Sequence, residues 1–392
     1  MAEAASPPEI GGVVAPGFEP VREAFADAFT SRGEVGAGCC VVLGGHVAVD
    51  LWGGEARPGV AWGPDTPTVV FSTTKGVTAL VVAALSERGE IDLSRPVAAY
   101  WPEFATGGKA TITVRQVLTH SSGVIDFPGY QDVIDDAAWW QDLDRVAGSW
   151  AAAEPAWQPG TAHGYHGASF GHLLGEVVRR ATGETLGALV RSVVAEPLGL
   201  DVWIGMPPSG HDRVALLLDP PPPTDPMVAA YLSLFTPETP TGRAHLARAG
   251  DMETIGTTFN DPALWAAEFP SGGGIATARG LAGMYGALAG DEPTILTAET
   301  VARHAAEAVR GPDLVLVFET RYGLGWQRPT PFTPMGPVDA AFGHGGLGGS
   351  LAFADPEHRL GFGYVMNALR YSGANEVTRA GALVDAVYSC LT

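Results

Sequence analysis

The chain has 392 residues, of which 46% are hydrophobic and 17% are charged, and its formal net charge is -20 at pH 7. The hydrophobic fraction is ample for a buried core and excludes disorder of the whole chain. Because so acidic a surface repels phosphate backbones and anionic lipids, we expect a soluble enzyme with no nucleic-acid and no membrane partner.

The N-terminal residues and the cysteines indicate the compartment. Residues 1–20 have no basic start and no long apolar stretch, so we expect no secretory signal peptide. No window reaches the ~18 uninterrupted apolar residues of a membrane span. Cys39, Cys40 and Cys390 are an odd number without metal-ligand spacing, which is typical of a reducing compartment. We therefore expect a cytoplasmic protein in which adjacent Cys39 and Cys40 are small buried hydrophobes on opposite faces of a strand.

The N-terminal part of the chain predicts a leader, a helix and a hairpin, in that order. Residues 1–17 show no periodic pattern and are expected to form a loose leader. Apolar residues at four-residue spacing predict a helix over 18–29. Apolar runs at 39–43 and 46–52 flank the pair Gly44-Gly45, which is typical of a tight turn between two strands.

The middle of the chain, 76–329, predicts helices and long loops. Apolar-rich patterns indicate helices at 76–86, 113–118 and 170–180. The segment 216–241 contains four consecutive prolines and several more, which predicts an irregular excursion. A loop of that length in a compact enzyme is often a lid or a pocket wall. We expect this part to form an inserted, mostly helical domain.

The C-terminal part repeats the hairpin-and-helix order of the N-terminal part. Apolar runs at 351–354 and 360–366 predict a second hairpin, and an amphipathic stretch at about 375–388 predicts a final helix. The expected fold class is therefore α+β: an antiparallel sheet built from 18–75 and 330–392, flanked by the N- and C-terminal helices, with the helical domain inserted between them.

The strongest chemical signal is Ser72, followed three residues later by Lys75 at the start of a predicted helix. That spacing places both side chains on one helix face, where an amine can reach the serine hydroxyl. A serine is a weak nucleophile unless a neighbouring base activates it. Lys75 and Lys109 are the only lysines of the sequence, which otherwise uses arginine for positive charge. Lysine can lose its proton when it is desolvated, whereas arginine cannot.

Five short stretches, in a fixed order, carry a resemblance to a known family. They are 71–75 (FSTTK), 117–123 (VLTHSSG), 157–166 (WQPGTAHGYH), 271–279 (SGGGIATAR) and 343–346 (GHGG). With these stretches the sequence resembles the serine β-lactamase and penicillin-binding-protein superfamily, and within it the class C-like branch that includes the family VIII carboxylesterases. The resemblance covers about residues 18–390. It implies a β-lactamase/transpeptidase-like fold.

The resemblance implies a catalytic role for three residues. Ser72 would be the acylated nucleophile, and Lys75 would be its partner one helical turn on. Tyr165 matches the tyrosine of the family's Tyr-x-Asn element and would act as a base on Ser72 and then as an acid toward the leaving group. A neutral Lys75 as the base, with Tyr165 relaying the proton, agrees equally well with the sequence. Which of the two is the general base stays open at this point.

The resemblance also implies an oxyanion hole and a substrate-binding strand. His344, Gly345 and Gly346 stand where the family has Lys-Thr-Gly, and the backbone N–H groups of Ser72 and Leu347 would form the oxyanion hole. His344 would polarise the Tyr165 hydroxyl or contact an ester oxygen. Position 167 is glycine where the family has asparagine, and position 344 is histidine where it has lysine. Both departures favour ester substrates over β-lactams and peptides.

A second serine offers an alternative nucleophile. The stretch 167–171 (GASFG) fits the Gly-x-Ser-x-Gly elbow of α/β-hydrolases, with Ser169 at its centre. That elbow needs a buried strand directly before it, whereas 155–166 is rich in proline, glycine and tryptophan. The alternating βαβ pattern is also missing. We therefore expect Ser169 to be a small residue that starts a helix.

No motif indicates a metal or a cofactor. His163, His166 and His172 are close in sequence, but no carboxylate or cysteine completes a zinc set around them. The stretch 343–348 (GHGGLG) fits a dinucleotide fingerprint, yet it leads into a strand instead of opening a helix. The sequence therefore predicts a hydrolase without cofactor or metal.

These observations lead to one principal hypothesis and several alternatives. The principal hypothesis is a serine carboxylesterase that hydrolyses short-chain esters through an acyl-enzyme on Ser72, with a small-molecule ester as its partner. An acyltransferase that passes the acyl group to an alcohol or amine would use the same site. A β-lactamase or D-amino-acid peptidase is disfavoured by the departures at positions 167 and 344. A non-catalytic binding protein is disfavoured because Ser72, Lys75 and Tyr165 are all present.

Overall fold

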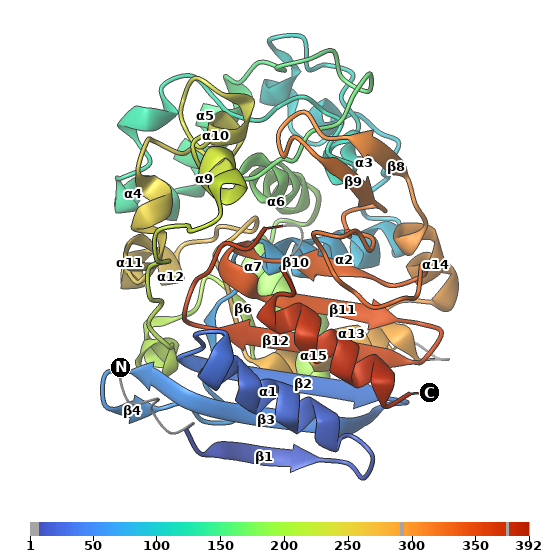
Figure 1. Ribbon diagram of the computed structural model, residues 1–392. Coiled ribbons are helices and arrows are strands. Elements are labelled where there is room, and N and C mark those ends of the chain that lie inside the picture. The colour runs from blue at the N-terminus through green and yellow to red at the C-terminus, as the bar shows by residue number, and fades with distance from the viewer. Residues whose placement is uncertain (1–7, 291–293, 374–375, 392) are drawn as a thin grey trace.

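One antiparallel sheet of seven strands joins the two ends of the chain (Figure 1). The computed structural model describes residues 8–290, 294–373 and 376–391. The strand order is β1-β3-β2-β12-β11-β10, and β4 pairs with β3. The strands are β1 (Ile10–Val14), β2 (Gly36–Leu43), β3 (His46–Arg57), β4 (Val60–Ala61), β10 (Phe342–Gly345), β11 (Leu351–Asp355) and β12 (Leu360–Met366). The N-terminal strands thus lie at one side of the sheet and β10 forms the opposite edge.

Helices cover both faces of this sheet. Helices α1 (Glu19–Ser31) and α15 (Arg379–Ser389) lie side by side on one face, as Figure 1 shows, and α13 (Ala278–Ala289) packs on the other. Because side chains alternate along a strand, Cys39 of β2 joins the core under α1 and α15, whereas Cys40 joins the core that includes α13. Both thiols are buried and free, and burial raises the pKa of Cys40 to about 12. The prediction for Cys39 and Cys40 is confirmed.

The two predicted hairpins and both terminal helices are present. In the first hairpin, Gly44 and Gly45 link β2 to β3 with φ of 56° and 82°, which is the left-handed backbone that a tight hairpin turn requires. The last helix begins four residues later than expected, at Arg379. The prediction of a loose leader over 1–17 is wrong for Ile10–Val14, because this segment is β1 and pairs with β3. Residues 1–7 lie outside the described residues.

The rest of the chain forms a mostly helical lobe above the sheet (Figure 1). Its helices are α2 (Thr74–Glu87), α3 (Val114–Leu118), α4 (Ala137–Gln141), α5 (Leu143–Ala151), α6 (Ser169–Thr182), α7 (Leu186–Leu189), α8 (Glu196–Leu198), α9 (Pro226–Leu232), α10 (Pro240–Ala244), α11 (Ile255–Phe259), α12 (Pro262–Ala266) and α14 (Ala298–Ala305). The lobe also contains two small sheets. One consists of β5 (Thr68–Val69), β6 (Val202–Ile204) and β7 (Gly274–Ala276), and the other of β8 (Val309–Pro312) and β9 (Glu319–Tyr322). The boundary expected at 76–329 needs one correction, because α13 comes from this stretch and packs on the large sheet.

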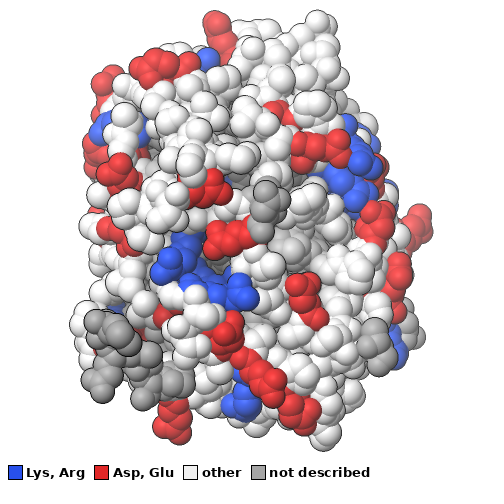
Figure 2. Space-filling model, in the orientation of Figure 1, with Lys and Arg blue, Asp and Glu red and all other residues white. Residues whose placement is uncertain are grey.

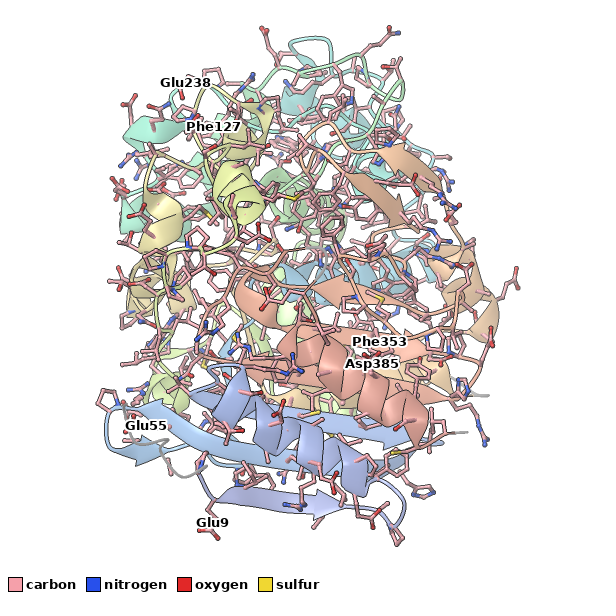
Figure 3. The ribbon with its side chains drawn as sticks, viewed as in Figure 1. Glu9, Glu55, Phe127, Glu238, Phe353 and Asp385 are labelled. Atoms are coloured by element: carbon pink, nitrogen blue, oxygen red, sulfur yellow. The ribbon has the colours of Figure 1, made fainter. Side chains whose placement is uncertain are left out.

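Aromatic side chains fill the core of the helical lobe. The ring of Phe127, labelled in Figure 3, lies 5.5 Å from that of Trp139 and 4.9 Å from that of Trp150. All three side chains are buried. Rings of this size dominate the burial of apolar surface, so they hold the loops between α3 and α6 in place. Among the described residues, no helix is both long and apolar enough to cross a bilayer.

Candidate active site

Ser72 lies in a short 3-10 turn, Phe71–Thr73, directly before α2. The preceding residue, Phe71, has φ of 44°, a left-handed backbone that a bulky side chain rarely adopts. Strain of this kind persists only where the surrounding structure imposes it, and it is frequent at functional sites. Ser72 is partly exposed and lines a cleft between the edge of the large sheet and the helical lobe.

Lys75 follows in the first turn of α2 and is fully buried. Its Nζ lies 3.3 Å from Ser72 Oγ and 2.8 Å from each of two backbone oxygens, those of Gly167 and Ser271. Burial away from water lowers the pKa of Lys75 well below its usual range. A neutral amine has two N–H donors and one lone pair. In that neutral form the two carbonyl oxygens accept both donors, which leaves the lone pair to accept the Ser72 hydroxyl proton.

Tyr165 brings its ring to the same point from the loop before α6. The ring centre lies 4.7 Å from Lys75 Nζ, and 4% of the residue is exposed. Burial raises the pKa of the Tyr165 phenol above its usual range, while hydrogen bonding with the Ser72 side chain opposes the shift. The structure therefore brings Ser72, Lys75 and Tyr165 together, as the sequence predicts, and burial favours the neutral form of both Lys75 and Tyr165.

Asp313, which the sequence analysis missed, fixes the backbone of Tyr165. Its Oδ1 accepts hydrogen bonds from the backbone N–H groups of Tyr165, Val315 and Leu316 at 2.8 to 2.9 Å. Its Oδ2 accepts a hydrogen bond from the Thr320 hydroxyl at 3.1 Å. The carboxylate is 2% exposed. It lies 148 residues after Tyr165 in a loop without a motif, so no sequence signal linked the two.

The backbone groups predicted for the oxyanion hole are available. In the described part of the chain, the N–H groups of Ser72 and Leu347 donate to no backbone or side-chain acceptor. Both residues line the cleft. A buried network holds their two segments together: the Ser350 hydroxyl donates to Val70 O at 2.8 Å and lies 3.0 Å from Thr73 Oγ1. Both N–H groups are therefore free to bind an oxyanion in the cleft.

The strand beside the serine presents its backbone to the cleft. Gly345 and Gly346 line the cleft, and Gly346 has no room for a side chain, because a Cβ there would lie 2.1 Å from Ser350 Oγ. His344, in contrast, is fully buried and does not line the cleft. Its Nδ1 donates to Gly345 O at 2.7 Å, and its ring centre lies 6.1 Å from that of Tyr165. Its Nε2 has no hydrogen-bond partner, so the structure shows neither of the two roles expected for His344, a hydrogen bond to the Tyr165 hydroxyl or a place in the cleft beside an ester oxygen.

Gly167 is enclosed on the side where a side chain would start. A Cβ at this position would lie 2.5 Å from Ala244 O and 2.9 Å from Cδ2 of His245. The His245 imidazole therefore occupies the space next to Gly167 that a larger residue would need. His245 lines the cleft, and no sequence motif singled it out.

The alternative nucleophile takes the structural role that the sequence predicts, and the three neighbouring histidines are buried side chains that do not line the cleft. Ser169 is the first residue of α6 and is fully buried, and no strand precedes it. The histidines 163, 166 and 172 belong to no group of metal-ligating side chains among the residues that the structure describes. His172 Nδ1 accepts a hydrogen bond from Trp150 at 3.0 Å.

The cleft has a volume of about 930 Å³ and mostly apolar walls. The excursion 216–241 supplies one wall, where Val228 and Tyr231 of α9 and Phe235 face the cleft, so its interpretation as a pocket wall is confirmed. Figure 2 shows acidic side chains spread over the drawn face and a group of basic ones near its centre. A site of this size and lining suits a small organic substrate with a large apolar part.

Comparison with known proteins agrees with the five stretches. Residues 21–386 match the model of the Beta-lactamase family. The chain belongs to this family. It is 36% identical over 91% of its length to esterase/beta-lactamase LipL of Mycobacterium tuberculosis, of which it covers 83%. Within the family, a crystal structure of a family VIII carboxylesterase superposes with a TM-score of 0.84 at 38% identity, over 97% of this chain and all of that one. A penicillin-binding-protein homologue from Caulobacter crescentus gives 0.82 at 39% identity, over 97% and 100%.

Proposed function

We propose that this family member is a serine hydrolase that cleaves carboxylic esters through an acyl-enzyme on Ser72. The observation that carries the proposal is a partly exposed hydroxyl 3.3 Å from a buried amine, beside two backbone N–H groups without acceptors. A nucleophile, a base and an oxyanion hole within one cleft are the three parts that acyl transfer requires.

We propose Lys75 as the base of the acylation step, because its buried Nζ lies 3.3 Å from Ser72 Oγ. As Ser72 Oγ attacks the ester carbonyl, its proton moves to the lone pair of Lys75 Nζ, and the N–H groups of Ser72 and Leu347 stabilise the oxyanion. The tetrahedral intermediate then breaks its bond to the alcohol. Tyr165 protonates the departing alkoxide, because burial keeps its phenol protonated, and it regains a proton from the Lys75 ammonium.

Two residues favour ester over amide substrates. Position 167 carries no side chain and position 344 carries a buried imidazole, so the cleft lacks the amide and the ammonium that the family's Asn and Lys would supply. Esters need less help than amides because an alkoxide is the better leaving group. The similarity to proteins described as an esterase and as a carboxylesterase supports the same conclusion.

The volume of the cleft bears on substrate size. Short-chain esters fill a small part of about 930 Å³, which is near the upper end for small-molecule sites. We infer that the enzyme hydrolyses short-chain acyl esters and also accepts those with a bulky apolar alcohol. Rates for a series of acetate esters with alcohols of increasing size measure this directly.

An acyltransferase is the second candidate, and the apolar walls of the cleft favour it. An alcohol acceptor gains binding energy from burying apolar surface there, whereas water does not. Product analysis of ester turnover, with and without a primary alcohol present, separates the two functions. Formation of the exchanged ester at millimolar alcohol would establish transfer, and formation of the free acid alone would leave hydrolysis.

The experiment that tests the proposed function is labelling with a fluorophosphonate, followed by peptide mapping. We expect label on Ser72 and loss of both label and ester hydrolysis in Ser72→Ala. Ser169→Ala is the matched control, because this serine is buried outside the cleft, and it should keep both. Full ester hydrolysis by Ser72→Ala would contradict the proposal.

A further inference from the structure

His245 lies at the reacting centre but takes no part in the acylation step described above. It follows α10 in the chain, and its ring centre lies 5.7 Å from that of Tyr165. Its Cδ2 lies 2.9 Å from the point where a Cβ on Gly167 would stand, and the oxygen of Gly167 accepts a hydrogen bond from Lys75. The imidazole thus lies beside the Tyr165 ring and beside the residue that accepts a hydrogen bond from Lys75.

The hydrogen bond on one side of the ring determines the state of the other side. Nδ1 lies 2.8 Å from the backbone oxygen of Thr241, and because a carbonyl only accepts, Nδ1 carries the proton. In the neutral ring, Nε2 then holds a lone pair. Burial, together with Lys75, lowers the pKa of His245 to about 4, so the ring is neutral near pH 7.

The lone pair of His245 is open to the cleft. In the described part of the chain, the unpartnered Nε2 atoms of His120, His172, His304 and His344 are all fully buried. The Nε2 of His245 has no partner either, yet it is not among the buried atoms, and the residue lines the cleft. It is therefore free to accept a proton from a molecule that enters.

Packing and backbone fix the direction of this ring. It lies between Tyr165 and Phe235, whose ring centre is 4.9 Å away. Ala244 O accepts a hydrogen bond from Ala168 N at 2.8 Å, which joins the end of α10 to the start of α6. The next residue, Leu246, has φ of 54°, so the chain turns sharply to hold His245 in place. Orientation set before the substrate arrives is what proton transfer requires.

We propose that His245 is the general base of deacylation. This role rests on the proposed function. Acylation and deacylation then have separate bases, Lys75 and His245. The lone pair of Lys75 faces Ser72 Oγ, which is esterified in the acyl-enzyme, whereas Nε2 of His245 faces the cleft from which water or an alcohol approaches. The nucleophile's oxygen bonds to the acyl carbon while its proton moves to Nε2. The bond to Ser72 Oγ then breaks, and the serine alkoxide regains a proton from the His245 imidazolium through Tyr165.

The test separates the two half-reactions with a chromogenic acetate ester in stopped flow. His245→Asn keeps an N–H for Thr241 O but has no basic nitrogen. We expect a burst of about one chromophore per chain at the wild-type rate, then a steady state lowered about 10²-fold. Intact mass spectrometry should show the acetyl group on Ser72. In His245→Ala, added imidazole should restore the steady-state rate of deacylation. It would not do so if the substitution had only disturbed the structure.

The control is His211→Asn, because His211 bonds to Met206 O away from the cleft lining, and it should turn over as the wild type does. A steady state in His245→Asn equal to that of wild type would overturn the inference. Equal losses of the burst rate and the steady-state rate in His245→Asn, without accumulation of an acetyl group on Ser72, would also overturn it. Failure of the proposed function gives a different result: no acetyl group on Ser72 in any variant while the ester is still consumed.

Discussion

Lys75 and Lys109 are the only two lysines of the sequence, and both side chains are fully buried among backbone carbonyl oxygens. The Nζ of Lys109 donates to Thr106 O and Ala151 O at 3.0 Å each, and also to Ala153 O. Three acceptors match the three N–H groups of an ammonium. Burial lowers the pKa of Lys109, and the carboxylate of Glu154 opposes that shift.

Lys75 differs from Lys109 in its third partner. It has two carbonyl oxygens and the Ser72 hydroxyl, and no carboxylate acts on its pKa, which burial lowers well below the usual range. The two lysines thus differ in the chemistry of the third partner, a hydroxyl for Lys75 and a carbonyl oxygen for Lys109, and in the carboxylate near Lys109. Both differences favour the charged form of Lys109 and the neutral form of Lys75.

The largest effect is expected from Lys75→Arg. Arginine keeps a positive charge and donors but cannot accept a proton, so kcat/KM for an ester should fall about 10³-fold or more. Initial rates measure this, with circular dichroism to confirm the fold. Activity within tenfold of wild type would mean that Lys75 acts as a cation and that the contrast with Lys109 is wrong.

Lys109→Met should change stability and leave activity intact. It removes three hydrogen bonds and leaves Ala153 O without a donor, which should lower the free energy of unfolding by about 3 kcal/mol. Urea unfolding measures the loss, and kcat/KM per folded molecule should stay within about twofold. Arg303→Met, on the exposed face of α14, is the control and should change neither. An inactive but stable Lys109→Met protein would contradict a purely structural role.

Asp313→Ala should lower kcat about tenfold through Tyr165. It removes the acceptor of the Tyr165 N–H and so frees the phenol from its place beside Lys75. Because the apolar walls of the cleft are untouched, KM should change little. Asp313→Asn retains an acceptor oxygen and should recover most of the loss. Equal losses of kcat in both variants would point to the charge of Asp313 instead of its position.

The smallest effect is the pH dependence of stability. The pKa of Lys75 is lower in the folded chain than in the unfolded chain. At pH values between these two pKa values, the unfolded chain therefore binds one more proton than the folded chain. Stability should therefore rise with pH across that window in the wild type relative to Lys75→Met. Urea unfolding at several pH values measures the difference, and parallel curves would show that Lys75 is charged when folded. Activity should likewise fall as pH drops through the folded pKa.

The sequence predicted what depends on short-range patterns. Ser72 and Lys75 are three residues apart at the start of α2, and Tyr165 stands in a recognisable stretch, so the proposed reacting groups were found together with both hairpins and both terminal helices. The prediction of a loose leader was wrong at Ile10–Val14, because this segment pairs with β3, a long-range contact between residues about forty apart in sequence.

The supporting residues could not be predicted for the same reason. Asp313, Ser350 and His245 are single polar residues in loops, each far in sequence from the group it contacts. His344 illustrates the converse, since the next residues of its stretch line the cleft as expected but its own side chain is buried. Orientation within a recognised stretch depends on packing, which spacing does not encode.

Because the chain has only two lysines, one NMR spectrum reports the protonation state of both. Protein labelled with 13C at lysine Cε gives one signal for each residue, and Lys109→Arg assigns them. At pH 7.5 we expect the Lys75 signal at the chemical shift of a neutral amine and the Lys109 signal at that of an ammonium. Two ammonium signals would contradict the assignment of Lys75 as the base that activates Ser72.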